Sequence, residues 1–61
     1  MANLTSKELI ALEEQISGEQ VLVKKYEAMA SLCTDTKLQQ DLNSFAAKHR
    51  GHYNTLISFL Q

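Results

Sequence analysis

The sequence predicts an all-α fold, an antiparallel hairpin of two helices that pairs with a second copy of itself into a four-helix bundle. Two observations predict it. Apolar residues recur in alternating steps of three and four along two segments, at about 6–33 and about 36–60, which is the spacing of one helix face. The 61 residues include no Pro, no Trp and only two glycines, a composition that favours helices. We expect one domain over residues 1–61.

The first helix is predicted to begin with a capping box. Thr5 can accept a hydrogen bond from the amide of Glu8, and the Glu8 carboxylate can reach back to the amide of Thr5. Leu4 and Leu9 occupy the two positions of a hydrophobic staple. The apolar line then continues along the helix, interrupted at Glu19, through Leu9, Leu12, Ile16, Val23, Tyr26, Ala30 and Cys33.

The second helix follows a short turn at Thr34 and Asp35, both of which are good N-cap residues. Because the connection is short, the two helices must be antiparallel. The second apolar line has the same steps, and two of its positions are histidines. Its members are Leu38, Leu42, Phe45, His49, His52, Leu56 and Phe59.

Three ionisable residues on the two lines are predicted to meet in one layer. With the turn centred near residues 34 and 35, residues at the same level have numbers that sum to about 69. Glu19 then lies opposite Arg50, between His49 and His52, and both imidazoles are expected to point inward. Gly18 and Gly51 fall at the same level.

Stabilisation is a problem for so short a chain. A domain of about 60 residues buries only ~60% of its unfolded surface, and a disulfide, a metal ion or a partner chain is the usual remedy. Cys33 is the only cysteine, so no disulfide can form within the chain. A partner chain, a metal ion or both remain. The two glycines, each costing roughly 0.5–1 kcal/mol relative to Ala, suggest room for an ion or close approach of another helix.

The converging residues predict a metal site. A buried carboxylate is costly unless it is paired or coordinates a metal, and carboxylate and imidazole suit zinc, iron and other first-row divalent ions. We therefore predict that Glu19, His49 and His52 bind a divalent ion, zinc or iron. The alternative is a polar layer without metal, in which Glu19 hydrogen-bonds one of the histidines and fixes the register of the helices.

Several function classes find no support. The formal net charge is −1 and the basic clusters are short, which argues against nucleic-acid binding. No apolar run approaches the ~20 residues of a membrane span, and no secretory signal is expected. No nucleophile lies beside a histidine and an orienting acid at a recognisable spacing, so we expect no enzyme. One free cysteine favours a reducing compartment, in line with synthesis in the cytoplasm.

Three segments carry a resemblance to a known family. They are Glu-Gln-Val-Leu-Val-Lys-Lys-Tyr at 19–26, Cys-Thr-Asp at 33–35 and Ala-Ala-Lys-His-Arg-Gly-His-Tyr-Asn-Thr-Leu at 46–56. They resemble small proteins of the spore coat protein F type from endospore formers, and the resemblance runs from Leu4 to Leu60. It implies a ferritin-like four-helix bundle of the rubrerythrin-like group, a location in the spore coat and other coat proteins as partners.

The group's metal-binding pattern is matched in part. It has a Glu on the first helix and Glu-x-x-His on the second. Glu19 matches the first Glu and His52 matches the His, whereas His49 stands where the second Glu belongs. This departure removes the carboxylate that normally bridges two irons.

Two functions are therefore predicted as alternatives. The leading one is a structural or interaction protein of the spore coat type, a homodimer with a central layer that can hold a metal ion. The other is a redox metalloprotein related to ferritin or rubrerythrin that acts on iron, oxygen or peroxide.

Overall fold

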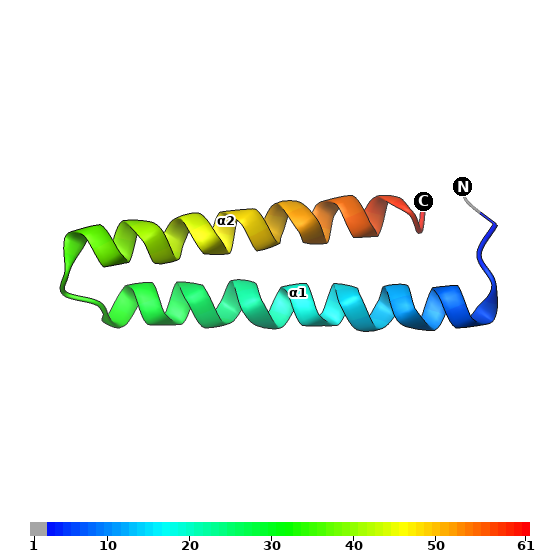
Figure 1. Cartoon of the computed structure of the whole chain (residues 1–61), viewed down its shortest axis with the longest axis horizontal. Helices are drawn as coiled ribbons and strands as arrows, with labels where there is room; N and C mark the ends of the chain where they lie inside the picture. The colour runs from blue at the N-terminus through cyan, green and yellow to red at the C-terminus, as the bar shows by residue number, and fades with distance from the viewer. Residues whose placement is uncertain (1–2) are drawn as a thin grey trace.

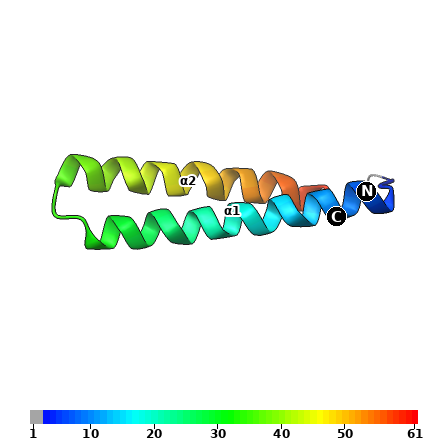
Figure 2. The same cartoon turned by 60° about the horizontal axis from the view of Figure 1, so that its bottom comes forward.

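The structure is a computed structural model that describes residues 3–61, so residues 1 and 2 of the predicted domain lie outside it. Helix α1 (Ser6–Leu32) and helix α2 (Thr36–Ser58) are joined by residues 33–35. The helices lie side by side and antiparallel, with the start of α1 and the end of α2 away from the turn, and α1 extends further than α2 (Figures 1 and 2). The predicted two-helix hairpin is confirmed.

Helix α1 begins with the predicted capping box. The Oγ1 atom of Thr5 accepts a hydrogen bond from the amide of Glu8 at 3.1 Å, and the amide of Thr5 donates to Oε1 of Glu8 at 2.9 Å. These bonds satisfy amides that have no partner in the first helical turn. At the other end, the amide of Cys33 donates to the carbonyl of Ala30 at 3.2 Å, and α1 ends at Leu32, one residue before the expected position.

The turn is closed by Asp35 rather than by Thr34. The Oδ1 atom of Asp35 accepts from the amide of Leu38 at 2.8 Å and caps α2. The side-chain amide of Gln39 donates to the carbonyl of Ala30 at 3.1 Å, which ties the start of α2 to the end of α1.

Helix α2 ends two residues earlier than expected, at Ser58 instead of about residue 60. The amide of Phe59 donates to the carbonyl of Leu56 at 3.1 Å, and that of Leu60 donates to Ile57 at 2.9 Å. These bonds span three residues rather than four, so the last turn tightens and the α-helix stops there.

The hairpin is a single layer with a thin core. Its Cα extents are 46 × 15 × 11 Å, and within the described range the buried hydrophobic residues are only Ile16, Ala30, Leu42 and Ala46. The accessible surface is 4635 Å², whereas a compact monomer of 6.9 kDa exposes about 4000 Å². One hairpin therefore leaves much of its apolar surface uncovered.

The two glycines do not face each other across the helix interface. A Cβ added at either Gly18 or Gly51 would meet no atom within 4 Å. Gly51 follows His49 by two residues, a rotation of about 200°, so it lies on the outer side of α2 and is exposed. The close approach expected at this level is therefore not present within the hairpin.

Replacing Asp35 by Ala should lower the free energy of unfolding by about 1 kcal/mol, because the amide of Leu38 loses its cap. Urea denaturation followed by circular dichroism measures the change. Thr34→Ala is the matched control and should change little, because Thr34 is exposed and is not the cap. An equal loss in the two variants would contradict the assignment of Asp35 as the cap.

Replacing Gly51 by Ala should raise the free energy of unfolding by roughly 0.5–1 kcal/mol, because Ala has the higher helix propensity and its methyl group meets no neighbour. The reverse change at an exposed position of the same helix, Ala47→Gly, should lower it by a similar amount. A loss of stability in Gly51→Ala would show that another surface contacts this side of α2.

Candidate metal centre

The site lies at the middle of the hairpin. Glu19 is the central residue of α1, with thirteen helical residues before it and thirteen after it. His49 and His52 are three residues apart on α2 and therefore share one side of that helix. Their rings meet edge to face, with centroids 5.4 Å apart and an interplanar angle of 89°.

One carboxylate holds both imidazoles. The Oε1 atom of Glu19 lies 2.9 Å from Nδ1 of His49, and its Oε2 atom lies 3.4 Å from the same nitrogen. Oε2 also lies 3.1 Å from Nδ1 of His52. Because an ionised carboxylate can only accept, each Nδ1–H donates to it. Glu19, only 4% exposed, is therefore buried but fully hydrogen-bonded.

The two histidines differ in their surroundings. The ring of Tyr26 stacks on His49 at 5.6 Å with an interplanar angle of 13°, and the side chain of His49 is 25% exposed. The side chain of His52 is 63% exposed and borders a shallow groove lined by Gln15, Thr55 and Leu56. The expectation that both rings point inward is therefore right for His49 and wrong for His52, which contacts Glu19 from the open edge of the layer.

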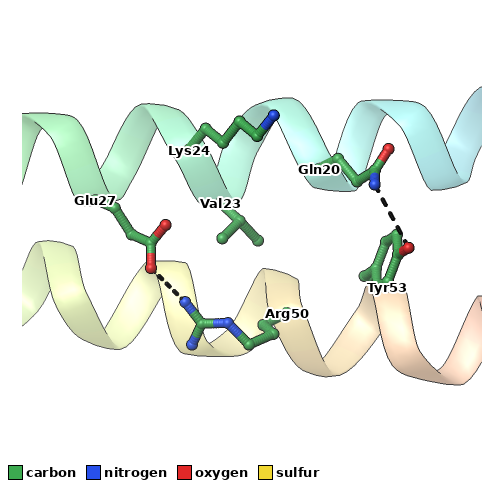
Figure 3. A pocket seen from close by; sticks show the side chains of 6 residues that line it. All are labelled: Gln20, Val23, Lys24, Glu27, Arg50 and Tyr53. Atoms are coloured by element: carbon green, nitrogen blue, oxygen red, sulfur yellow. Dashed lines mark hydrogen bonds and ion pairs between the residues drawn. The ribbon is translucent and has the colours of Figure 1, made fainter.

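Arg50 has the predicted level along the hairpin but does not join the cluster. Its Nη2 atom lies 2.5 Å from Oε2 of Glu27. Both residues line a groove between the helices, in which the side-chain amide of Gln20 also donates a hydrogen bond of 3.4 Å to the hydroxyl of Tyr53 (Figure 3). The groove also includes Val23 and Lys24. The sequence analysis did not predict this groove. Residues 20, 24 and 27 on α1, and residues 50 and 53 on α2, are spaced by three or four and so share one side of each helix, which is the pattern that could have indicated it.

The hydrogen bond from His49 lowers the pKa of Glu19 below its ordinary value of 4.5. Burial acts in the opposite direction, because it raises the pKa of a carboxyl group, while the charges of His49 and His52 and the hydrogen bond from His52 lower it further. Glu19 is therefore ionised at neutral pH and offers a negative charge at the centre of the hairpin.

The three groups could hold a divalent cation. One ligand atom from each of Glu19, His49 and His52 lies within 4.8 Å of the others. In a tetrahedral zinc site with bonds of about 2.0–2.2 Å, neighbouring ligand atoms are about 3.3–3.5 Å apart. The oxygen–nitrogen distances of 2.9, 3.1 and 3.4 Å are close to this spacing, whereas the group as a whole is held only to within 4.8 Å, so the two imidazoles would have to draw together around an ion. An ion could replace the two Nδ1 protons after this movement.

The same cluster is also complete as a polar layer. Among the residues that the structure describes, no buried side-chain nitrogen or oxygen lacks a hydrogen-bond partner. The polar-layer alternative predicted one hydrogen bond from Glu19 to a histidine, and the structure shows both histidines engaged. Because a ligating nitrogen must be unprotonated, each Nδ1 proton would have to move to Nε2 or to solvent, and metal binding would weaken as the pH falls.

Comparison of the chain with protein-family models, curated proteins and solved structures finds no match. Neither helix of the described range has the length and apolar character needed to cross a membrane.

Without metal, the stability contributed by Glu19 should depend on pH. Because its pKa is lower in the folded state, the folded state binds fewer protons and stability rises with pH between the folded and unfolded pKa values. The contribution is complete above about 4.5 and lost as the pH falls through the lower folded value. Glu19→Gln cannot ionise, so the stability difference from wild type should shrink on acidification through this range.

Urea denaturation in EDTA over a pH series measures this difference. Glu14→Gln, which neutralises an exposed carboxylate on the same helix, is the matched control. Its difference from wild type should be small at every pH. A Glu19→Gln difference that stays constant from neutral to acidic pH would contradict the role of the histidines as donors to Glu19.

Proposed function

We propose that this chain is a small structural protein without enzymatic activity, and that its hairpin binds a divalent metal ion through Glu19, His49 and His52. The observation that carries the proposal is the convergence of one carboxylate and two imidazoles from two helices within 4.8 Å. This donor set suits zinc or iron. The low pKa of Glu19 supports it further, since a ligating carboxylate must be ionised.

The benefit of an ion here would be structural. Glu19 belongs to α1 and the two histidines to α2, so an ion bound by all three would connect the helices at mid-length. Binding to the folded state alone stabilises it by about 2.7 kcal/mol when the free ion is at 100 times its dissociation constant. For a hairpin with four buried hydrophobic residues, this is a large fraction of a small domain's stability.

A location in the spore coat is part of the same proposal and rests on the residue resemblance at 19–26, 33–35 and 46–56. A metal-braced helical hairpin that exposes apolar side chains suits a component of a larger protein assembly. The expected partners are other coat proteins and a second copy of the chain.

A redox protein acting on iron, oxygen or peroxide is the second candidate, and the donor set favours it less. The candidate metal cluster holds one carboxylate per chain. Carboxylate-bridged di-iron centres of four-helix bundles use a Glu from each of the four helices. His49 occupies the position where the second carboxylate of each hairpin would stand.

Untagged protein should bind Zn²⁺ or Co²⁺ at neutral pH, and Glu19→Ala, His49→Ala and His52→Ala should each weaken binding at least about tenfold, since even groups that only support a ligand cost 10–100-fold. Competition against a chromophoric chelator measures the affinity. Glu14→Ala removes an exposed carboxylate from α1 and should bind as wild type does.

Unchanged affinity and unchanged melting temperature in Glu19→Ala would refute the metal proposal. The iron-loaded protein separates the two candidates. A structural protein should remain folded after chelation, with at most a lower melting temperature, and should not accelerate the oxidation of ferrous iron. Protein-dependent oxygen consumption that disappears in Glu19→Ala would favour the redox candidate.

A further inference from the structure

A line of half-exposed residues runs along α2 and includes a metal ligand. Side chains at every seventh position share one side of a helix. On α2 this line consists of Leu38, Phe45, His52 and Phe59, and all four are exposed. The open edge of the metal cluster therefore lies within an apolar surface.

Helix α1 extends this surface. Gln15, Leu22 and Met29 also recur at every seventh position, and Gln15 lines the groove beside His52. The line on α1 and the line on α2 therefore border the same side of the hairpin. We call this side the His52 face and define it by the six residues Leu22, Met29, Leu38, Phe45, His52 and Phe59.

The two sides of the hairpin differ in charge. The groove of Figure 3 carries Lys24, Glu27 and Arg50 on the other side. None of the six residues that define the His52 face is Lys, Arg, Asp or Glu. An apolar surface can contact its own copy across a two-fold axis, and Lys25 and Lys48, each one helical turn from residues of the His52 face, would lie at the rim of that contact.

The size of this side of the hairpin is also close to that of an interface. The whole side of the hairpin that includes the His52 face has a Cα outline of at most 46 × 15 Å, roughly 700 Å², so a contact over its full length would approach the ~800 Å² that each partner buries in a standard protein–protein interface. The accessible surface of the hairpin exceeds that of a compact monomer of its mass by about 600 Å². Covering the His52 face would bury the apolar area that the single layer leaves open.

We propose that a second copy of the chain covers the His52 face and that the two Glu19/His49/His52 clusters form one metal-binding layer, so that metal binding and dimerisation strengthen each other. This inference rests on the proposed function and adds the partner that completes the site.

The position of Glu19 supports a shared layer. A two-fold axis parallel to the helices brings every level of one hairpin to the same level of the other. A two-fold axis perpendicular to the helices brings only the middle of one hairpin to the same level as the middle of the other. Glu19 is the central residue of α1, so it lies at that level. Either arrangement that overlaps the hairpins over their full length therefore brings the two clusters to one level.

The number of ligands that a metal ion needs couples metal binding to dimerisation. One hairpin supplies three ligands, whereas a tetrahedral ion takes four. The second copy supplies the fourth position or excludes bulk water from it on the open side, at His52. Any ion that binds the dimer more tightly than the monomer must, by linkage, tighten the dimer by the same factor.

Sedimentation equilibrium of the untagged chain, with EDTA or with Zn²⁺ over a micromolar concentration series, tests the proposal. Zn²⁺ should lower the dissociation constant of the dimer at least about tenfold. Met29→Glu and Phe59→Glu place charges on the His52 face and should each weaken the dimer with and without zinc. Val21→Glu, at an exposed apolar position outside that face, is the matched control and should not.

His52→Ala should keep the metal-free dimer and lose the effect of zinc. Zinc that binds a monomer with an affinity independent of protein concentration would overturn this inference and leave the proposed function intact. A dimer that binds no zinc would overturn both. Metal content measured on the same samples distinguishes these two failures.

Discussion

The buried carboxylate of Glu19 is the constraint on which the rest of the hairpin depends. Burying it unpaired would cost several kcal/mol, and the two Nδ1 donors of His49 and His52 remove that cost. They also fix the register. Sliding α2 by one heptad, about 10 Å, would place apolar residues opposite Glu19 and leave the carboxylate without donors. Those residues are Leu42 and Phe45 in one direction, and Leu56 and Phe59 in the other. A heptad pattern alone permits such shifts, and the polar layer excludes them.

The thinness of the hairpin connects this layer to the surface. Two helices can bury only the side chains that lie between them, and among the larger apolar side chains of the described residues only Ile16 and Leu42 reach that state. The next residues around each helix stay half-exposed, and His52 is one of them. The feature that opens the cluster to an incoming ion is therefore the same feature that leaves the apolar side chains beside it uncovered.

The sequence predicted the parts of the structure that depend on spacing along the chain. These are the helices, the capping box at Thr5 and Glu8, the antiparallel arrangement and the level at which Glu19 meets the histidines. It was less informative about rotation around the helix axis. Arg50 has the same level as Glu19, but it is rotated by about 100° from His49 and pairs with Glu27 on the other side. The exposure of His52 has the same origin, since it depends on what covers the open edge. Spacing gives the level of a residue, whereas packing decides the direction of its side chain.

A polar layer and a metal site are compatible interpretations of one geometry, and His49 is the residue that makes them so. A second carboxylate at this position would put two negative charges in a buried layer, and a cation would then be needed to offset them. An imidazole instead donates a hydrogen bond to Glu19 at 2.9 Å, so the layer is satisfied without an ion. The hydrogen bonds already hold the Glu19 oxygens and each imidazole Nδ1 near the oxygen–nitrogen spacing that a tetrahedral ion requires. When an ion replaces the two Nδ1 protons, part of the cost of ordering these side chains has therefore already been met. The cluster therefore satisfies its own hydrogen bonds without an ion, and the same three side chains could hold one.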